Sequence, residues 1–146
     1  MTRSGLRALF LSAGLAGALT LPAAGAAAAG TLYADLGGQA GITRIVHELF
    51  ANATADPRIA HDFENINLDW LRPRVVLQIC ALTGGPCKYT GRDMRAAHKG
   101  LHLATFDFNA FAEDLQIAMD RAGVPFSTQN RLLAILAPMH RDIVTR

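Results

Sequence analysis

The feature that most constrains the fold is a succession of apolar segments of helical period, each ended by glycine or proline. Between residues 42 and 50 the apolar positions recur every three or four residues, which predicts a helix over about 39–53. The glycine pair 37–38 precedes this segment, and the Asp56-Pro57 pair follows it. No stretch shows the alternation of polar and apolar residues that marks a β-strand, so the sequence predicts an all-α domain.

The remaining helices are predicted from apolar spacing and from side chains that can cap their N-termini. A short first helix spans 31–36, another short helix ends near residue 98, and Pro138 should kink the last helix. The predicted caps are Asp56 for a helix over 57–62, Asn67 for 68–82, Thr105 for a helix that ends at Gly123, and Ser127 or Thr128 for the last helix.

The first 30 residues have the pattern of a secretory signal peptide. Arg3 and Arg7 precede an apolar run over 9–21, and small residues fill 22–30. We therefore expect a cleaved leader over 1–30, a mature domain over 31–146, and a periplasmic or secreted protein. The alternative is an uncleaved membrane anchor, although the apolar run is short for a span of ~20 residues.

The charge of the mature chain argues against a nucleic-acid partner. The full sequence has 14 Lys and Arg residues and 12 Asp and Glu residues. Removal of Arg3 and Arg7 leaves 12 of each, so the mature net charge is 0. No cluster of basic residues remains that would attract a phosphate backbone.

Two cysteines lie close together in the sequence, on either side of the turn 84–86. In an oxidising compartment Cys80 and Cys87 can pair, because this turn can bring their Cα atoms within the ~4.4–6.8 Å of a disulfide. The alternative is a buried free Cys80 with an exposed Cys87. A zinc site that also uses His98 and His102 is disfavoured by the ligand spacing.

His98 has the most suggestive setting of the five histidines. A glycine-rich loop over 84–91 leads into its short helical segment, which stops at Gly100. Such an imidazole can serve as the axial ligand of a haem iron. The alternative is a histidine with no cofactor, buried or on the surface. His47 could approach the opposite side of a haem or be exposed, and His61, His102 and His140 lack supporting context.

The ordered motifs of the chain resemble the truncated haemoglobins, most closely group 1 of that family. The resemblance runs from about residue 32 to 144. It is carried by the opening segment 32–38, by Asp56-Pro57-Arg58-Ile59 with Phe63, by the segment 84–98, and by the turn 123–125. It implies an all-α truncated globin fold, a two-over-two helical sandwich, with haem b as the cofactor.

The resemblance also implies roles for individual residues. His98 falls on the proximal iron ligand, bound through Nε2 while a backbone carbonyl orients Nδ1–H. Phe63 falls on a phenylalanine that packs on the haem, and Arg74 on a cation near a propionate, the alternative being a solvated side chain. The other implied haem contacts on these segments are Tyr89, Met94, Leu103, Phe108 and Phe111.

The distal side departs from the family pattern. Phe50 stands where group 1 members often have a tyrosine, and Val75 where they often have glutamine. Leu71 takes the usual distal position, and Ile79 the place of a phenylalanine that gates a gas tunnel. A donor to bound O₂ contributes roughly 1.5–3 kcal/mol, so its loss should speed O₂ release ~10–100-fold. Bound CO and NO should be affected less.

Three functions follow as hypotheses. The first is a haem protein that binds a diatomic gas for transport, scavenging or sensing. The second is a haem enzyme, such as a nitric oxide dioxygenase or a peroxidase, which would need an electron donor that the sequence does not identify. The third is a cofactor-free periplasmic helical module with thiol redox activity. The resemblance favours the first, and a membrane partner is expected only if the leader stays uncleaved.

Overall fold

The structure is a computed structural model that describes residues 30–146, and the leader predicted over 1–30 lies outside this range except for its last residue. Within the described residues all regular structure is helical, and no helix is long and apolar enough to cross a membrane. The elements are α1 (Leu32–Asp35), α2 (Gly38–Ala55), η1 (Ala60–Phe63), α3 (Leu68–Leu82), α4 (Met94–His98), α5 (Thr105–Arg121), α6 (Phe126–Leu136), η2 (Ala137–Met139) and α7 (His140–Ile143).

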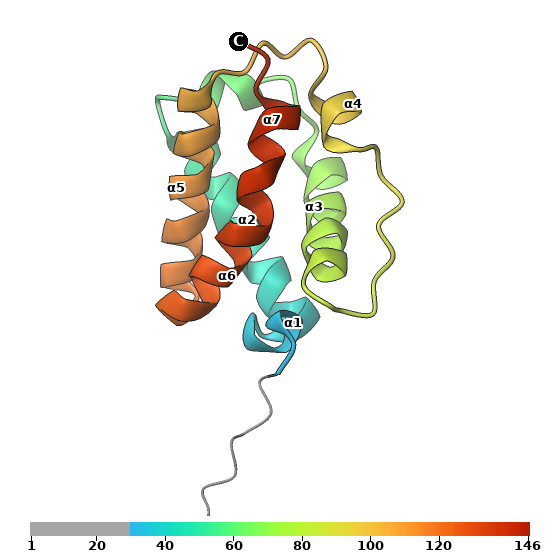
Figure 1. Cartoon of the computed structure of the whole chain (residues 1–146). Helices are drawn as coiled ribbons and strands as arrows, with labels where there is room; N and C mark the ends of the chain where they lie inside the picture. The colour runs from blue at the N-terminus through green and yellow to red at the C-terminus, as the bar shows by residue number, and fades with distance from the viewer. Residues whose placement is uncertain (1–29) are drawn as a thin grey trace, which may run out of the picture.

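Two helix pairs form the two layers of the fold (Figure 1). Helix α2 packs on α3 to make one layer, and α5 packs on α6 to make the other. The layers meet along α2 and α5, while α1 lies at the ends of α2 and α6. This arrangement is the two-over-two helical sandwich that the resemblance implies.

The core lies where α2 meets its neighbours. Burying a large aliphatic side chain contributes about 1.5–3 kcal/mol, so this apolar contact is the main force that holds the layers together. The apolar positions that predicted α2 are its buried face, and they meet buried residues of α3, α5 and α6. The core contains Ile42, Ile45, Val46, Leu49, Phe50, Val76, Ile79, Cys80, Leu115, Ala118, Met119 and Leu132.

The predicted helix limits are confirmed in part. Asn67 caps α3 as expected, since its Oδ1 accepts the backbone N–H of Trp70 at 3.0 Å. The prediction for α5 was wrong: Thr105 is its first residue and not its cap, and the Asp107 carboxylate accepts the Ala104 N–H at 2.8 Å. The hydrogen bond at the start of α5 is thus made by the carboxylate of Asp107 and not by the hydroxyl of Thr105.

Proline determines both ends of the last long helix. Helix α6 begins at Phe126, directly after Pro125, so the expected cap at Ser127 or Thr128 was wrong. Pro125 has φ −59°, which already suits entry into a helix. The expected kink at Pro138 is confirmed as a break, because α6 ends and the short η2 segment leads into α7.

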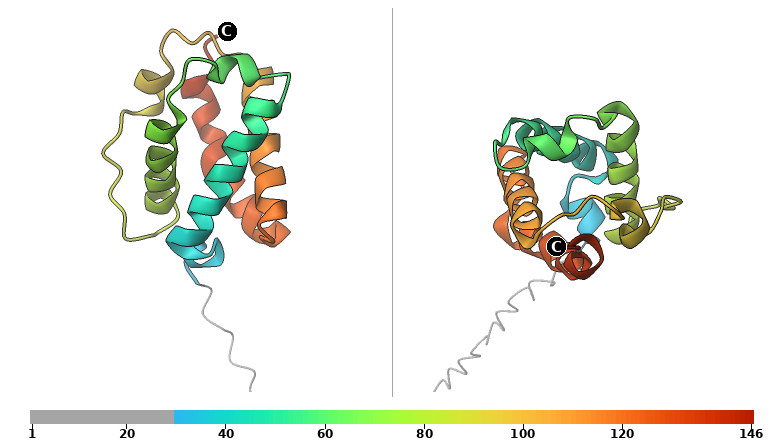
Figure 2. Two further views of the ribbon diagram at one scale, coloured as in Figure 1. Left: turned by 180° about the vertical axis from the view of Figure 1, so that it is seen from behind. Right: turned by 90° about the horizontal axis from the view of Figure 1, so that it is seen from above.

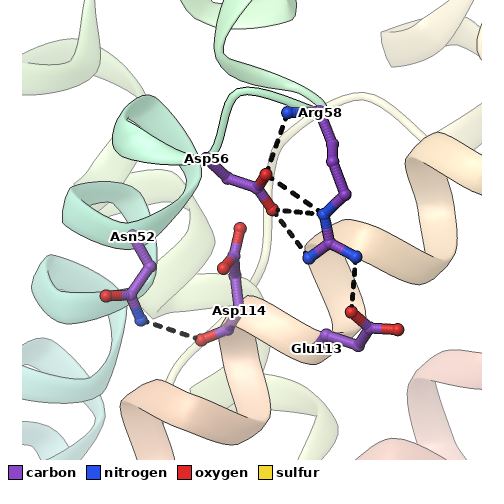
Figure 3. Close-up of polar contacts among 5 residues, drawn as sticks. All are labelled: Asn52, Asp56, Arg58, Glu113 and Asp114. Carbon is purple, nitrogen blue, oxygen red and sulfur yellow. Dashed lines mark hydrogen bonds and ion pairs between the residues drawn. The ribbon is translucent and has the colours of Figure 1, made fainter.

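The segment after α2 forms a turn and then a 3₁₀-helix, and not the helix predicted over 57–62. Asp56 accepts the backbone N–H of Arg58 at 2.9 Å, so its carboxylate caps a turn. The Arg58 guanidinium bonds both Asp56, at 2.7 Å, and Glu113 of α5, at 2.6 Å (Figure 3). Asn52 adds a bond to the backbone oxygen of Asp114 at 3.1 Å. These contacts hold the approach to η1 against α5.

Candidate haem site

The imidazole of His98 is held in one orientation by its own helix. Asp93 caps α4, and the Nδ1 atom of His98 lies 2.8 Å from the backbone oxygen of Met94. Because a carbonyl oxygen can only accept, Nδ1 carries the hydrogen and Nε2 keeps a free lone pair. Nε2 has no hydrogen-bond partner among residues 30–146. This is the tautomer and the second-sphere contact that a metal-binding histidine requires.

The loop that leads to His98 is closed by a disulfide. Cys80 and Cys87 are bonded, with their Cα atoms 5.8 Å apart, which confirms the predicted pairing. Gly85 lies in the turn between them, where an added Cβ would be 2.5 Å from the Tyr33 ring and 2.6 Å from Cys80 Sγ. The bonded sulfurs offer no thiolate, and no group of three His, Cys, Asp or Glu side chains suited to a metal ion occurs among the described residues.

The end of the chain supports the His98 segment from the other side. Arg95 of α4 pairs with Asp142 of α7 at 2.7 Å. The backbone N–H groups of Thr145 and Arg146 donate to the oxygen of Leu103 at 2.9 and 3.2 Å. Helix α4 is therefore held by contacts to the C-terminal segment as well as by the disulfide-closed loop before it.

Several apolar side chains that the resemblance predicts as haem contacts are only half-buried. Helix α3 packs on α2. In Figures 1 and 2 its ribbon stands apart from those of α6 and α7, and α4 lies near one end of α3. A flat apolar macrocycle would complete the burial of these side chains, and His98 would supply its iron with a nitrogen ligand, so the side chains fit a haem. The half-buried apolar contacts are Phe63, Leu71, Val75, Met94, Leu103, Phe108 and Phe111.

Three aromatic rings from separate elements meet in one apolar cluster. Phe50 of α2 is 1% exposed and lies edge-on to Phe63, with ring centroids 5.8 Å apart. Phe111 of α5 stacks on Phe63 at 5.8 Å and is tilted against Phe50 at 6.0 Å. Phe50, which stands where group 1 members often have a tyrosine, is thus packed against apolar rings.

One face of helix α3 carries apolar residues together with a polar residue, Gln78, that was not among the predicted site residues. Leu71 and Val75 are half-buried, as a distal position requires, whereas Ile79 is 4% exposed and belongs to the core. Gln78 is also half-buried, and its amide Nε2 lies 3.3 Å from the Sδ atom of Met94 on α4. Its spacing from Leu71 and Val75, seven and three residues, was the signal that could have identified it.

Arg74 and Tyr89 line one cavity of about 230 Å³ between α3 and the loop before α4. The exposed Arg74 guanidinium lies 3.5 Å from the centre of the Trp70 ring and donates to the Trp70 oxygen at 2.6 Å. Tyr89 is half-buried and donates to the Arg92 oxygen at 2.9 Å. The structure thus brings the predicted propionate-binding cation and Tyr89 together, and their contact with haem stays a prediction.

Comparison with known proteins assigns the family. Residues 31–145 match the family model of the bacterial-like globins. The group 1 truncated haemoglobin of Synechocystis sp. is 34% identical, over 80% of this chain and 98% of its own length. The chain belongs to the group 1 truncated haemoglobins. It is a haem-binding globin whose ligand is a diatomic gas.

Solved structures of this family match the fold described above. The Fe(III) form of the truncated haemoglobin from Tetrahymena pyriformis has a TM-score of 0.77 and 28% identity, covering 80% of this chain and 100% of that chain. The 2/2 haemoglobin of Synechococcus sp., in the cyanomet state with covalently attached haem, has a TM-score of 0.75 and 26% identity, with the same coverage. The two-over-two arrangement is therefore that of haem-containing relatives.

The other histidines of this truncated haemoglobin are placed differently from His98. His47 is exposed and lines a groove of about 370 Å³ on the outer side of α2 and α3, so the expectation that it is exposed is confirmed. His140 is half-buried, but its Nε2 already lies 3.1 Å from the hydroxyl of Thr105. The remaining two, His61 and His102, are exposed.

Proposed function

We propose that this truncated haemoglobin binds a diatomic gas reversibly at the iron of a haem b held by His98, for transport, scavenging or sensing. The observation that carries the proposal is the hydrogen bond from His98 Nδ1–H to the Met94 oxygen at 2.8 Å, which leaves Nε2 free. Bound haem would supply the Lewis-acidic iron. The chain would orient the imidazole and exclude water from the gas.

The remaining residues divide by position around the haem. Phe63, Leu103, Phe108 and Phe111 would cover the macrocycle and keep water out, because they are apolar and half-buried. Arg74, on the exposed side of α3, would meet a propionate. The apolar distal side chains Phe50, Leu71 and Val75 suit ligands that carry little charge when bound, such as CO and NO.

His98→Ala tests the iron ligand. We expect this variant to lose most of its haem, or to lose the five-coordinate ferrous spectrum, because His47, His61 and His102 are exposed and His140 is already hydrogen-bonded to Thr105. Soret absorbance per polypeptide measures haem content, and added imidazole should restore part of it. His102→Ala is the matched control, since that exposed histidine lies four residues away. Normal haem content and spectra in His98→Ala would contradict the assignment.

The alternative is enzymatic turnover of the gas, as in a nitric oxide dioxygenase. Two measurements separate it from reversible binding. A gas-binding protein mixed with NO in its oxygenated ferrous form should react once and stop. If NO consumption continued when a reductant was supplied, and its rate depended on the protein and not on the reduction step, the result would favour an enzymatic function.

We also propose that the protein is exported and acts in the periplasm or outside the cell. Two observations support this: the signal-peptide pattern over 1–30 and a disulfide, which is typical of proteins in oxidising compartments. The intact mass of native protein recovered after export tests the proposal. It should correspond to a chain that starts near Thr31, and a full-length mass would contradict cleavage.

A further inference from the structure

The charges of the mature chain are divided between two parts of the fold. Residues 68–104 and 137–146, which form α3, the loop after it, α4, η2 and α7, contain eight Lys and Arg residues and three Asp and Glu residues, so their net charge is +5. Residues 31–67 and 105–136 contain four and nine, so their net charge is −5. We call these parts the basic half and the acidic half. A mature chain of zero net charge is therefore strongly polarised.

The elements of the basic half lie next to one another and include the predicted iron ligand. In Figures 1 and 2 the loop over 83–93 runs beside α3, and α4 lies near one end of α3. Arg74 of α3 and Tyr89 of this loop line one cavity. Helix α4 contacts α7, where Arg95 pairs with Asp142 at 2.7 Å. His98 lies on α4, so a haem bound there would be on the basic half.

The acidic side chains of the basic half are all engaged, whereas most of its cations are not. Asp69 bonds Arg72 at 3.2 Å, Asp142 bonds Arg95, and Asp93 caps α4. Five exposed cations of the basic half have no ion pair among residues 30–146. They are Arg74, Lys88, Arg92, Lys99 and Arg141.

The acidic half shows the opposite balance. Three of its four cations bond carboxylates, since Arg58 pairs with Asp56 and Glu113, Arg121 with a glutamate of α2, and Arg131 with an aspartate of α1. Arg44 is exposed and has no ion pair in the described part of the chain. Unpaired positive charge is thus concentrated on the half that carries His98.

We propose that the basic half is a docking surface for an acidic protein that delivers single electrons to the haem. The proposal rests on the proposed function of gas binding at His98, which needs ferrous iron. When O₂ leaves as superoxide the iron becomes ferric, and one electron from the iron–sulfur cluster or flavin of the donor makes it ferrous again. No bond forms or breaks in that transfer. Both cysteines of the chain are bonded, so no thiol of its own can supply the electron.

The exposed apolar side chains of the basic half favour a protein over a lipid surface. Trp70 is 52% exposed with the Arg74 guanidinium 3.5 Å from its ring centre, and Leu101 is 51% exposed. Tryptophan and arginine are enriched at the centres of protein interfaces. Anionic lipid is bound instead by amphipathic helices or by runs of basic residues, and the cations here are dispersed over several elements. Ionised propionates of a haem would offset Arg74 and leave the other four cations for the partner.

Electron transfer from an acidic plant-type ferredoxin with a two-iron cluster tests the docking surface. We expect reduced ferredoxin to convert the ferric protein with a rate constant that falls about 10-fold between ~0.01 M and ~0.3 M NaCl, because salt screens the attraction. The variant Lys88→Glu/Arg92→Glu should lower the low-salt rate constant about 10-fold. Its retention on a column of immobilised ferredoxin should weaken in parallel, and this second readout does not depend on iron.

Arg44→Glu is the matched control for Arg92→Glu, because it makes the same change of charge at an exposed, unpaired arginine of the acidic half. It should leave reduction by ferredoxin nearly unchanged. Dithionite, a small reductant that needs no docking surface, should reduce all variants at nearly the same rate. Equal slowing by Arg44→Glu and Arg92→Glu would show an effect of net charge alone and would overturn the proposal, as would a ferredoxin rate that did not depend on salt.

Two further results are separated by the same set of proteins. Binding to vesicles that contain phosphatidylserine, with no retention on ferredoxin, would overturn the proposal in favour of a lipid surface. Haem content and the CO complex of the wild type are measured first. If the wild type took up no haem or bound no CO, the proposed function would fail, whereas retention on ferredoxin would still report whether the basic half docks an acidic protein.

Discussion

Phe50 lies where one oxygen atom would change the chemistry of the distal side. Its ring is 1% exposed and is packed by Phe63 and Phe111, so a tyrosine ring fits the same cluster with only a hydroxyl added. In Phe50→Tyr we expect that hydroxyl to supply a hydrogen-bond donor to the distal side. O₂ release should slow about 10-fold and autoxidation should also slow, because a hydrogen bond to a charged acceptor contributes about 1.5–3 kcal/mol.

Stopped-flow measurement of O₂ release checks the Phe50→Tyr prediction, with the CO release rate as an internal reference that should change little. The control is Phe111→Tyr, which places a hydroxyl in the same aromatic cluster from α5. An unchanged O₂ release rate in Phe50→Tyr with an intact Soret band would mean that the added hydroxyl does not reach the gas.

Single residues could be proposed as site residues where a motif specifies them, and the haem contacts proposed in this way stay predictions. His98 could be singled out because the spaced glycines and the Met94-to-His98 interval fix its place along the chain. The resemblance implies the tautomer of His98, but the sequence does not show which carbonyl sets it. The structure identifies the Met94 oxygen. The partial burial of Gln78 was not predicted, because a polar residue in an apolar helix is expected to be exposed. Its contact with Met94 on α4 is visible only in the structure.

At the scale of elements, the disulfide joins the end of α3 to the loop that leads to α4. Cys80 is fully buried, and Gly85 packs against its sulfur and against the Tyr33 ring. Closing so short a loop contributes about 2–3 kcal/mol in the chain-entropy model. The same bond restricts the segment that carries Met94 and His98, so oxidation of the cysteines should also slow haem loss.

The double variant Cys80→Ala/Cys87→Ser measures both effects. We expect the free energy of unfolding to fall by about 2–3 kcal/mol and haem transfer to an acceptor globin to become faster. Wild-type protein treated with a thiol reductant should approach the variant, while the variant itself should not respond to reductant. Equal stability and equal haem loss with and without the bond would show that the loop is held by packing alone.

The limits of the elements could be predicted only where a side chain decides them locally. Asn67 marks the start of α3 because its own carboxamide oxygen accepts the backbone N–H three residues on. Thr105 does not cap α5: its hydroxyl lies 3.1 Å from His140 Nε2, a contact that the local sequence does not show, and Asp107 accepts the N–H of Ala104. The turn before η1 is tied to α5 by the contact of Arg58 with Glu113, which no local pattern records.

At the scale of the whole molecule, the layer arrangement could be predicted from the resemblance but not from periodicity. Apolar spacing places the buried face of α2 correctly, whereas in α3 it points to Leu71, Val75 and Leu82 and the structure buries Val76, Ile79 and Cys80. Many all-α folds satisfy the same spacing. How far α3 stands from the α6–α7 segment is a property of the assembled layers. The partial burial of Leu103 and Phe108 likewise depends on the assembled fold and not on local spacing.

One buried carboxyl group couples this assembly to pH. Asp114 of α5 is 4% exposed, and its Oδ2 has no hydrogen-bond partner among the described residues (Figure 3). Burial raises its pKa above the ordinary 3.8, and the nearby Asp56 and Glu113 raise it further, against the effect of Arg58. The folded state then holds this proton to higher pH than the unfolded state does. Asp114 therefore lowers stability as pH rises through its folded-state pKa.

Asp114→Asn should stabilise the protein at pH 7, by about 1 kcal/mol, because it removes a buried charge that lacks a full set of partners. The gain should shrink as pH falls and vanish below the ordinary carboxyl pKa of 3.8, where both states of the wild type are protonated. Asp56→Asn is the control of opposite sign. The hydrogen bonds from Arg58 lower the pKa of Asp56, so that variant should lose stability at pH 7 and match the wild type in strong acid. Urea unfolding of both variants from pH 2 to pH 8 measures the two trends. A gain for Asp114→Asn that did not depend on pH would assign its effect to packing and not to charge.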